Sequence, residues 1–391
     1  MSRPERWIRL RGKPRGPRAF RRDLAETAPG LGAGDLTALL AADGDEILGW
    51  GLYHPSSQVA WRELRRGPEP PDEEWVRAAA RAAAERRRRS PEIDERLCRV
   101  VHAEGDDLPA LVVDRYGDLL AVELFSTAAL PLARLALPEL HEALGTRHHR
   151  LALDAAAARA EGEAAWVETS PGCPELVQVE EDGIRFEIDL RRGHKTGFFL
   201  DQRENRARLR RQVAAVEEAE VLDVCCYSGG FALAAAAAGA AAVTAVDLDE
   251  EALAMARRNA NLNRSRSIRF VQADAFGYLR TLAANGRSFD FVVLDPPKFV
   301  PSRRERERGL ARYHDLNKLA LPLVRPGGLL LTCSCSGLLS ALEFQERVRQ
   351  AARRAGRTAR LERLTGAGPD HPVRLDFPEG AYLKALWLRI T

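Results

Sequence analysis

The feature that most constrains the fold is a regular alternation of short apolar runs with helical segments in the second half of the chain. The apolar runs occupy residues 221–225, 242–246, 268–271, 289–294 and 329–332. Strands that are apolar along their whole length are buried on both faces, as in a parallel sheet. The helices between them then form right-handed crossovers. Two further strands, near 359–364 and 383–390, complete a seven-stranded sheet whose last strand is antiparallel, so we predict an α/β domain over residues 191–391.

Two smaller regions precede this domain. Residues 1–68 contain short strand-like runs separated by Gly and Pro turns, which predicts a small β-barrel. A Pro-rich stretch then marks a boundary, and Asp72 is placed to cap a helix that ends near Arg89. Strands and helices mix from there to residue 190, which predicts a central α+β domain over residues 69–190.

Composition excludes several classes of protein. Hydrophobic residues make up 45% and charged residues 29%, which is not the balance of a disordered, collagen-like or coiled-coil chain. The longest apolar stretch is shorter than the roughly 20 residues of a membrane helix, and the first residues do not resemble a secretion signal. The six cysteines show neither a disulfide framework nor zinc-binding spacing. We therefore expect a cytoplasmic protein with no bound metal and no membrane contact.

The distribution of positive charge says more than the net charge of +3. Basic residues crowd residues 1–22, and further arginine runs occur at 86–89, 191–192 and 206–211. Each run alone is as well explained by the general use of arginine in this chain. Together the runs favour an anionic partner, and nucleic acid is the first candidate.

A cofactor site is indicated where the first strand of the predicted sheet meets its helix. The strand contains Asp223 and leads into a turn with Gly229, where the backbone can approach a ligand closely. Asp247 ends the second strand, where an acid can accept ribose hydroxyls, and Asp274 follows the third, beside the expected adenine. The sheet is thus Rossmann-like, but the G-x-G-x-x-G spacing of dinucleotide enzymes is absent. Acids suit S-adenosylmethionine (SAM), which is cationic and has no phosphates, although each Asp alone could also be a helix N-cap.

The loop 194–202 is expected to close over this cofactor, with Phe198 and Gln202 nearest to it. The alternative is that this loop packs against the central domain. The candidate cofactor-binding residues are Asp223, Tyr227, Gly229, Asp247, Asp274, Asp295, Phe198 and Gln202.

A reaction site is indicated at the ends of the fourth and fifth strands. Asp295 ends the fourth strand and is followed by two prolines that fix an extended loop. The fifth strand ends in Cys333-Ser334-Cys335, and cysteine is also a common small core residue. A thiolate that adds to C6 of a pyrimidine makes C5 nucleophilic, and an acid can stabilise the charge on the ring. Cys335, further out and just before a helix start, is the candidate nucleophile, with Asp295 as its catalytic partner.

Five segments carry a family resemblance: residues 193–203, 226–231, 295–299, 334–337 and 378–380. Together they resemble the bacterial large-subunit ribosomal RNA cytosine-5 methyltransferase I family. The resemblance implies a PUA-like RNA-binding barrel, a central domain and a class I SAM-dependent methyltransferase domain, acting on ribosomal RNA, expected to be 23S. It also maps the nucleophile onto Cys335. The family's N-terminal His-Pro-Trp-[Val/Ile]-Phe element is replaced here by Gly16-Pro17-Arg18-Ala19-Phe20, which bears on RNA recognition.

Four functions stay open at this point. The first is 5-methylcytosine formation through a covalent cysteine–C6 adduct. The others are an amino-group methyltransferase of RNA or protein that stacks the base on Phe299, a uracil-5 enzyme, and a non-catalytic ribosome-assembly factor. The base that removes the C5 proton, either Cys333 or a water held by Asp295, is also open, as are the target nucleotide and a homodimeric state.

Overall fold

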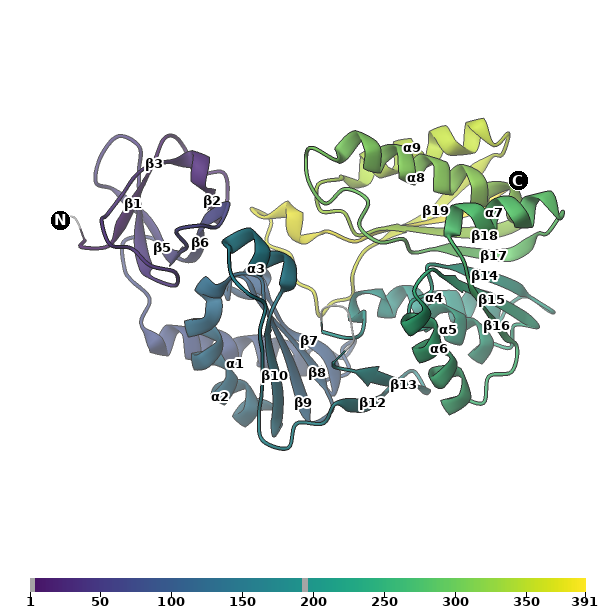
Figure 1. The fold of residues 1–391 in the computed structure, drawn as a ribbon, viewed down its shortest axis with the longest axis horizontal. Helices are drawn as coiled ribbons and strands as arrows, with labels where there is room; N and C mark the ends of the chain where they lie inside the picture. Colours follow the sequence, from purple (N-terminus) through teal and green to yellow (C-terminus); the bar gives the residue numbers. More distant parts are fainter. Residues whose placement is uncertain (1–3, 192–195) are drawn as a thin grey trace. The chain divides into compact units, whose positions relative to one another are not determined.

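The computed structural model describes residues 4–191 and 196–391 (Figure 1). The chain forms two compact units that are interleaved along the sequence. Unit 1 comprises residues 1–177, 188–198 and 369–380, and unit 2 comprises residues 178–187, 199–368 and 381–391. The predicted boundaries at 68/69 and 190/191 stay predictions.

The N-terminal part of unit 1 is a six-stranded sheet with the strand order β2-β6-β5-β4-β1-β3. Its strands are β1 (Trp7–Leu10), β2 (Arg18–Phe20), β3 (Leu24–Thr27), β4 (Leu36–Leu40), β5 (Ile47–Tyr53) and β6 (Val59–Arg66). Ile8 and Trp61 lie at the centre of its own small core. The strands and turns expected for residues 1–68 are present, and the likeness to a PUA domain stays a prediction.

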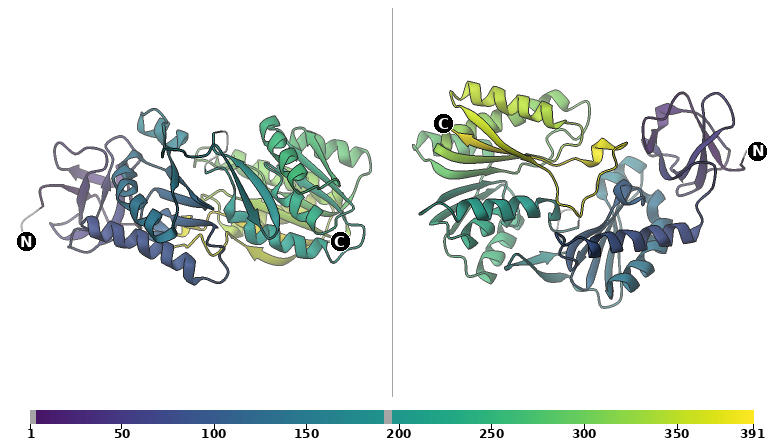
Figure 2. Two further views of the ribbon diagram at one scale, coloured as in Figure 1. Left: turned by 90° about the horizontal axis from the view of Figure 1, so that it is seen from below. Right: turned by 180° about the vertical axis from the view of Figure 1, so that it is seen from behind.

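The central part of unit 1 is a five-stranded sheet with the order β11-β10-β9-β8-β7, covered by helices. Its elements are α1 (Glu73–Arg89), β7 (Leu97–His102), β8 (Leu111–Tyr116), β9 (Leu119–Leu124), α2 (Leu130–Leu144), β10 (His148–Leu153), α3 (Ala155–Glu161) and β11 (Val167–Thr169). Asp72 caps α1 as predicted, because its side chain accepts from Trp75 N–H. Helix α1, dark blue in the right-hand view of Figure 2, and α2 bury their apolar faces against this sheet.

Unit 2 contains a seven-stranded sheet with the order β16-β15-β14-β17-β18-β20-β19. Its strands are β14 (Glu220–Val224), β15 (Ala242–Asp247), β16 (Ile268–Gln272), β17 (Phe289–Leu294), β18 (Val324–Ser334), β19 (Ala359–Thr365) and β20 (Lys384–Ile390). Strands β14 to β18 pair in parallel, and β20 is antiparallel to both of its neighbours. The Rossmann-like α/β prediction is confirmed, and β18 begins five residues earlier than expected.

Helices cover both faces of this sheet (Figure 1). They are α4 (Arg203–Val213), α5 (Gly230–Ala237), α6 (Glu250–Leu262), α7 (Ala275–Ala284), α8 (Arg306–Ala320) and α9 (Ala341–Arg354). Val221 belongs to the core with α4, α5 and α6, whereas its neighbour Leu222 belongs to the core with α7, α8 and α9. This is the two-sided burial that the continuous apolar strands predicted.

A short hairpin, β12 (Leu176–Glu181) and β13 (Ile184–Asp189), lies between the central sheet and the seven-stranded sheet in the sequence. In the described part of the chain, no helix is both long and apolar enough to cross a membrane.

Candidate active site

The site begins with the way the parallel strands of unit 2 end together. Val224 of β14 lies opposite Val246 of β15 and Leu294 of β17. Beyond the strand ends, Asp295 N–H still donates to Val224 O (3.2 Å), and Cys226 N–H donates to Val246 O (3.0 Å). The segments that carry the predicted site residues therefore meet at the carboxyl edge of the sheet, where open α/β sheets bind ligands.

Asp223 is fully buried just inside this edge. Its Oδ2 accepts from Ala232 N–H (2.9 Å), and its Oδ1 is buried without a hydrogen-bond partner in the structure. Burial, followed by the nearby charges of Asp295 and Asp247, raises the pKa of Asp223 to about 8. Like charges thus converge around an unsatisfied oxygen, which is an environment that a cationic ligand would relieve.

The other two predicted acids are engaged by backbone groups. Asp247 Oδ2 accepts from Tyr227 N–H (2.8 Å) and Oδ1 accepts from Asp249 N–H (3.0 Å). Asp274 Oδ1 accepts from Gly277 N–H (2.9 Å), so this residue is the N-cap of α7. A carboxylate oxygen has two acceptor sites, and roles for both acids toward a nucleoside stay predictions.

The turn after β14 is held in an unusual backbone conformation. Cys225 and Tyr227 have positive φ angles of 63° and 47°, and Gly229 has 84°. A Cβ on Gly229 would lie 3.2 Å from Ala256 Cβ. Glycine is therefore required at position 229 by its backbone conformation and by its packing against α6. The sequence alone had suggested only close approach to a ligand as the reason for this glycine. Left-handed non-glycine residues cluster at ligand-binding turns.

Both cysteines of this turn are poor candidates for chemistry. Burial first, and the surrounding acids second, raise the pKa of the Cys225 and Cys226 thiols. A thiol with a raised pKa stays protonated and unreactive. We therefore interpret both as packing residues.

The end of β18 presents the two cysteines and the two serines to opposite faces of the sheet. Ser334 Oγ donates to Tyr313 OH (2.9 Å), and Ser336 Oγ lies 2.9 Å from the same hydroxyl. Because both serines contact α8 and strand side chains alternate, Cys335 between them points the other way, as Cys333 does. Cys333 belongs to the core on the side of α4 and α5.

The two cysteines differ in exposure. Cys333 is fully buried, and burial first, then the charge of Asp295, raises the pKa of its thiol well above the usual value. Cys335 is half-buried. Leu294 of β17 lies opposite Thr332 of β18, so Asp295 follows the fourth strand beside the segment that carries both cysteines. Of the two, Cys335 is the one that a substrate can reach.

The two predicted residues of the loop 194–202 separate. Phe198 is buried in unit 1. Gln202 lies in the short helix Leu200–Gln202 of unit 2, where its Oε1 accepts from Asn205 (2.6 Å) and its side chain lies close to the Cys333 thiol, where it opposes the rise in that thiol's pKa. The structure therefore brings Gln202 close to Cys333, and a role for Phe198 toward the cofactor stays a prediction. His194 and Lys195 lie outside the described residues, and closure of this loop stays a prediction.

Sequence reasoning missed two side chains that shape the site. Tyr313 is buried and hydrogen-bonds both serines of the cysteine segment. Arg206 is buried under Gly230, donates to Glu181 (2.6 and 2.7 Å) and to Phe199 O (2.9 Å), and carries a pKa raised partly by Asp295. Apolar spacing in α8 could have marked Tyr313 as an inward residue. Arg206 lies within an arginine run, and nothing in the sequence distinguishes it from its neighbouring arginines.

The arginine runs support nucleic-acid binding less strongly in the structure than they did in the sequence. Most of their described members form ion pairs: Arg86 and Arg87 with Asp106, Arg88 and Arg89 with Glu85, Arg191 with Glu175 and Asp189, and Arg206 with Glu181. Arg192 lies outside the described residues. In the N-terminal run, Arg11, Lys13 and Arg15 are exposed and form no ion pair with a described residue. Fewer basic side chains are therefore available to bind RNA than the arginine runs in the sequence indicated.

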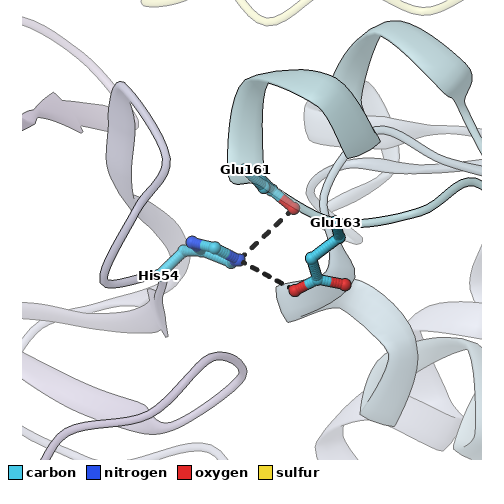
Figure 3. A group of neighbouring side chains, drawn as sticks. All are labelled: His54, Glu161 and Glu163. Carbon is cyan, nitrogen blue, oxygen red and sulfur yellow. Dashed lines mark ion pairs between the residues drawn. The ribbon is translucent and has the colours of Figure 1, made fainter.

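One group of three described side chains has the composition of a metal site: His54, Glu161 and Glu163 (Figure 3). His54 Nε2 lies 3.3 Å from Glu161 Oε2 and 3.8 Å from Glu163 Oε1. However, His54 Nδ1 accepts from two backbone N–H groups (3.1 and 3.0 Å), which leaves the ring proton on Nε2. Nε2 donates to Thr127 Oγ1 (2.9 Å), which in turn lies 3.0 Å from Glu161 Oε2. We interpret the group as a hydrogen-bonded junction between the N-terminal and central sheets, because a ligating nitrogen would need a free lone pair.

Comparison with known proteins agrees with this geometry. The family of S-adenosylmethionine-dependent methyltransferases matches residues 106–389. Ribosomal RNA large subunit methyltransferase I of Tolumonas auensis is 38% identical over 349 residues, covering 87% of this chain and 86% of its own. The protein of the same name from Shewanella amazonensis is 38% identical over 366 residues, covering 91% of each chain.

The fold has a counterpart among solved structures. A candidate methyltransferase solved in complex with SAH superposes with a TM-score of 0.80 at 19% identity, over 98% of this chain and 100% of the other. The α/β fold described above is that of a SAM-dependent methyltransferase. The chain belongs to the S-adenosylmethionine-dependent methyltransferase family, in the group of proteins named ribosomal RNA large subunit methyltransferase I.

Proposed function

We propose that this enzyme methylates C5 of a cytosine in large-subunit ribosomal RNA, through a covalent adduct between Cys335 and C6 of the base. The observation that carries the proposal is the placement of a half-buried thiol, Cys335, beside the strand that ends in Asp295, at the edge that gathers the cofactor acids. The names of the relatives support ribosomal RNA as the substrate class. That the RNA is 23S and that the methylated atom is C5 are parts of our proposal.

The residues of the cofactor site fit SAM. Asp223, Asp247 and Asp295 form a negative cluster with one buried oxygen that lacks a hydrogen bond, and SAM carries two positive charges and no phosphate. When bound, SAM supplies a methyl group on a positively charged sulfur. The side chains that hold the nucleoside are then Asp247 and, beside the adenine, Asp274.

The protein supplies nucleophilic and acid catalysis. The Cys335 thiolate forms a bond to C6, which places electron density on C5 and makes this carbon the methyl acceptor. The carboxyl group of Asp295 hydrogen-bonds N3 and the exocyclic amine of the ring and stabilises the charge that develops there. After methyl transfer, loss of the C5 proton and cleavage of the Cys335–C6 bond restore the aromatic base and the thiolate.

The structure bears on which of the two candidate bases removes the C5 proton. Cys333 is fully buried, and its thiol pKa lies well above the usual value. Such a thiol remains protonated near neutral pH and cannot accept a proton. A water molecule held by Asp295 is therefore the proposed base.

The amino-group alternative has less support. That reaction would stack the target base on Phe299 after the Asp-Pro-Pro element. Phe299 is buried, its ring lies 4.9 Å from the Tyr313 ring, and the Arg312 guanidinium lies 4.3 Å from its centre. A ring packed on these neighbours offers no face to a base.

RNA is proposed to contact the N-terminal sheet of unit 1. Arg11, Lys13 and Arg15 are exposed and form no ion pair with a described residue. Arginine and lysine side chains without protein partners can neutralise phosphates. The oligomeric state, for which a homodimer was considered, stays open to measurement.

The decisive experiment compares Cys335→Ser with Cys333→Ser. Each variant is incubated with labelled SAM and unmodified large-subunit RNA, and the methylated nucleoside is identified. We expect Cys335→Ser to lose methyl transfer and keep SAM binding, and Cys333→Ser to retain transfer. RNA that contains 5-fluorocytosine should trap the wild-type protein at Cys335. Full activity of Cys335→Ser, or an adduct mapped to Cys333, would overturn the assignment.

A further inference from the structure

Three arginines of unit 2 converge where α4 meets the last strands of the seven-stranded sheet. Arg208 and Arg211 are three positions apart on α4, so their side chains share one face of the helix. The Arg208 guanidinium lies over the Trp387 ring, 5.2 Å from its centre. Arg363 of the edge strand β19 is the register partner of Trp387, and side chains of partnered residues lie on the same face of a sheet. We call Arg208, Arg211 and Arg363 the arginine cluster.

The protein does not neutralise the charge of this cluster. None of the three arginines forms an ion pair with a described residue. Arg208 is half-buried, and its Nε is buried without a hydrogen-bond partner in the structure. Burial first, and the charges of Arg363 and Arg211 second, lower the pKa of Arg208. Like charges gathered in this way repel one another, so the cluster favours an anion.

The acids closest to the cluster do not supply that negative charge. Glu362, which precedes Arg363 in β19, is already engaged, because its two oxygens accept from Arg389 (2.8 and 3.2 Å). Glu204, one turn before Arg208 on α4, is exposed and forms no ion pair within the described part of the chain. The cluster therefore remains open to an anion from outside the protein.

Two members of the cluster belong to the last of the arginine runs that the sequence analysis considered. Folding divides this run into engaged and free side chains. Arg206 pairs with Glu181, and Arg210 donates to a backbone carbonyl. Arg208 and Arg211 make no side-chain hydrogen bond with a described residue. Arg363 lies far away in the sequence, so the cluster itself is visible only in the structure.

The cluster lies on the sheet face toward which Cys335 points. Trp387 and Cys333 belong to the same core beside α4, and Cys335 points the same way as Cys333 because strand side chains alternate. Trp387 is opposite Leu331 of β18, four residues before Cys335. A strand rises about 3.3 Å per residue and strands lie about 4.8 Å apart, so the cluster is roughly 15–20 Å from Cys335. A nucleic-acid strand covers this distance with a few nucleotides.

We propose that the arginine cluster binds backbone phosphates of the RNA strand a few nucleotides away from the target base. The inference rests on the proposed function, in which RNA presents a cytosine to Cys335. Guanidinium groups bind phosphate oxygens in pairs, and a strand whose base reaches Cys335 carries a phosphate at every nucleotide. The cluster fixes the path of the strand and does not touch the reacting atoms, so its members are positioning residues.

The test measures RNA affinity as a function of salt, without SAM, for two double variants. Arg211→Met with Arg363→Met removes the two exposed charges of the cluster and leaves Arg208 packed on its ring. Arg353→Met with Arg354→Met is the matched control, because these arginines of α9 are also exposed and form no ion pair with a described residue. Helix α9 covers the opposite face of the sheet.

The cluster variant should bind unmodified large-subunit RNA on the order of tenfold more weakly at low salt, with a salt dependence shallower by about 0.7 to 0.9 for each phosphate lost. The control variant should bind as the wild type does. In methylation assays, the loss of kcat/KM in the cluster variant should come mainly from a higher KM for RNA. Lysine at positions 211 and 363 retains the charges and should restore most of the salt dependence, which a merely structural role would not do.

A second measurement needs no variant and therefore stays decisive if the substitutions disturb folding. Phenylglyoxal modifies accessible arginine side chains, and mass spectrometry maps the modified positions. Bound RNA should slow the modification of Arg211 and Arg363 in the wild-type protein and leave that of Arg354 unchanged. Equal salt dependence in the wild type and the cluster variant, or no protection of Arg211 and Arg363, would overturn the inference.

The 5-fluorocytosine adduct reports separately on the proposed function. An adduct at Cys335 without protection of the cluster removes only the phosphate site. Protection of the cluster without any adduct keeps the phosphate site and removes the covalent mechanism at Cys335.

Discussion

The chain buries carboxylates in both units, and their surroundings differ. In unit 1, Asp106 is fully buried and accepts from the guanidinium groups of Arg86 and Arg87 and from His102 N–H. In unit 2, Asp223 is equally buried, but it accepts from one backbone N–H, and the charges that raise its pKa are those of other acids. A buried acid matched by arginines belongs to the framework, whereas a buried acid such as Asp223, whose pKa is raised by burial and by neighbouring acids, indicates a site for a cation.

The largest expected effect is a loss of stability when the arginine-paired acid of unit 1, Asp106, is replaced. Asp106→Asn leaves the Arg87 guanidinium buried without its carboxylate, and loss of one partner of a buried pair costs about 3–5 kcal/mol. We expect the free energy of unfolding in urea to fall by that amount. Glu85→Gln, which removes an exposed partner of Arg88 and Arg89, is the control and should cost far less. Similar losses for the two variants would contradict a framework role for Asp106.

The next effect concerns the acids of unit 2 and the affinity for SAM. Asp247→Ala removes the proposed acceptor for the ribose of SAM, and hydrogen bonds to charged groups contribute about 1.5–3 kcal/mol. Calorimetry should therefore show SAM affinity reduced by one to two orders of magnitude, with folding largely retained. Asp290→Ala removes an acid at the opposite edge of the same sheet, where it binds Arg325. SAM affinity should be unchanged in this control, and equal affinities in both variants would remove the ribose assignment.

A smaller, pH-dependent effect should distinguish Asp223. Because the pKa of this acid is raised from 3.8 to about 8 in the folded protein, its protonated form is favoured by folding. Its contribution to stability is present at low pH and is lost as pH rises from about 4 to about 8. Asp223→Asn should therefore gain stability relative to wild type as pH rises through this range, in urea titrations of the cofactor-free protein.

The binding of SAM should show the opposite dependence on pH, because the cation favours the ionised acid. Wild-type affinity for SAM should rise between pH 6 and pH 8, with release of a proton that calorimetry in buffers of different ionisation enthalpy can detect. Asp223→Asn should bind more weakly and lose this pH dependence. A wild-type affinity that is constant with pH would show that Asp223 is ionised before the cofactor arrives.

The smallest effect sharpens the comparison at the surface of unit 1. Replacing Arg11, Lys13 and Arg15 by Ala should reduce the steepness with which RNA affinity falls with salt, by about 0.7 to 0.9 for each phosphate that the variant no longer neutralises. The SAM affinity should not change. Arg134→Ala removes an exposed arginine that is paired with Glu168, and should leave the salt dependence as it is. An unaltered slope in the triple variant would mean that RNA does not bind this segment.

Much of the fold could be predicted because its signals are local. Each apolar run that predicted a strand of the seven-stranded sheet is a strand, since the central strands are buried on both faces and are therefore mostly apolar along their length. The helix cap at Asp72 was equally readable, because a cap involves residues three positions apart. Asp223, Asp247 and Asp295 were predicted to meet, since the carboxyl ends of neighbouring parallel strands lie at one edge.

The site residues that were missed or misplaced depend on contacts between distant parts of the chain. Tyr313 meets Ser336 across 23 residues, and Arg206 meets Glu181 across 25. Phe198 is buried within unit 1, and its predicted role at the cofactor stays a prediction. Whether an arginine is free for RNA or bound to a carboxylate likewise depends on which side chains folding brings to it.

The sequence by itself therefore determined the order of strands and helices in the α/β domain and the sheet edge at which the candidate site residues lie, because those features follow from periodicity and from residues at strand ends. Only the tertiary structure decided which charges are paired and which of the two cysteines, Cys333 or Cys335, is partly exposed. Periodicity acts over a few residues, whereas burial and ion pairing are set by neighbours that the chain acquires only when it folds.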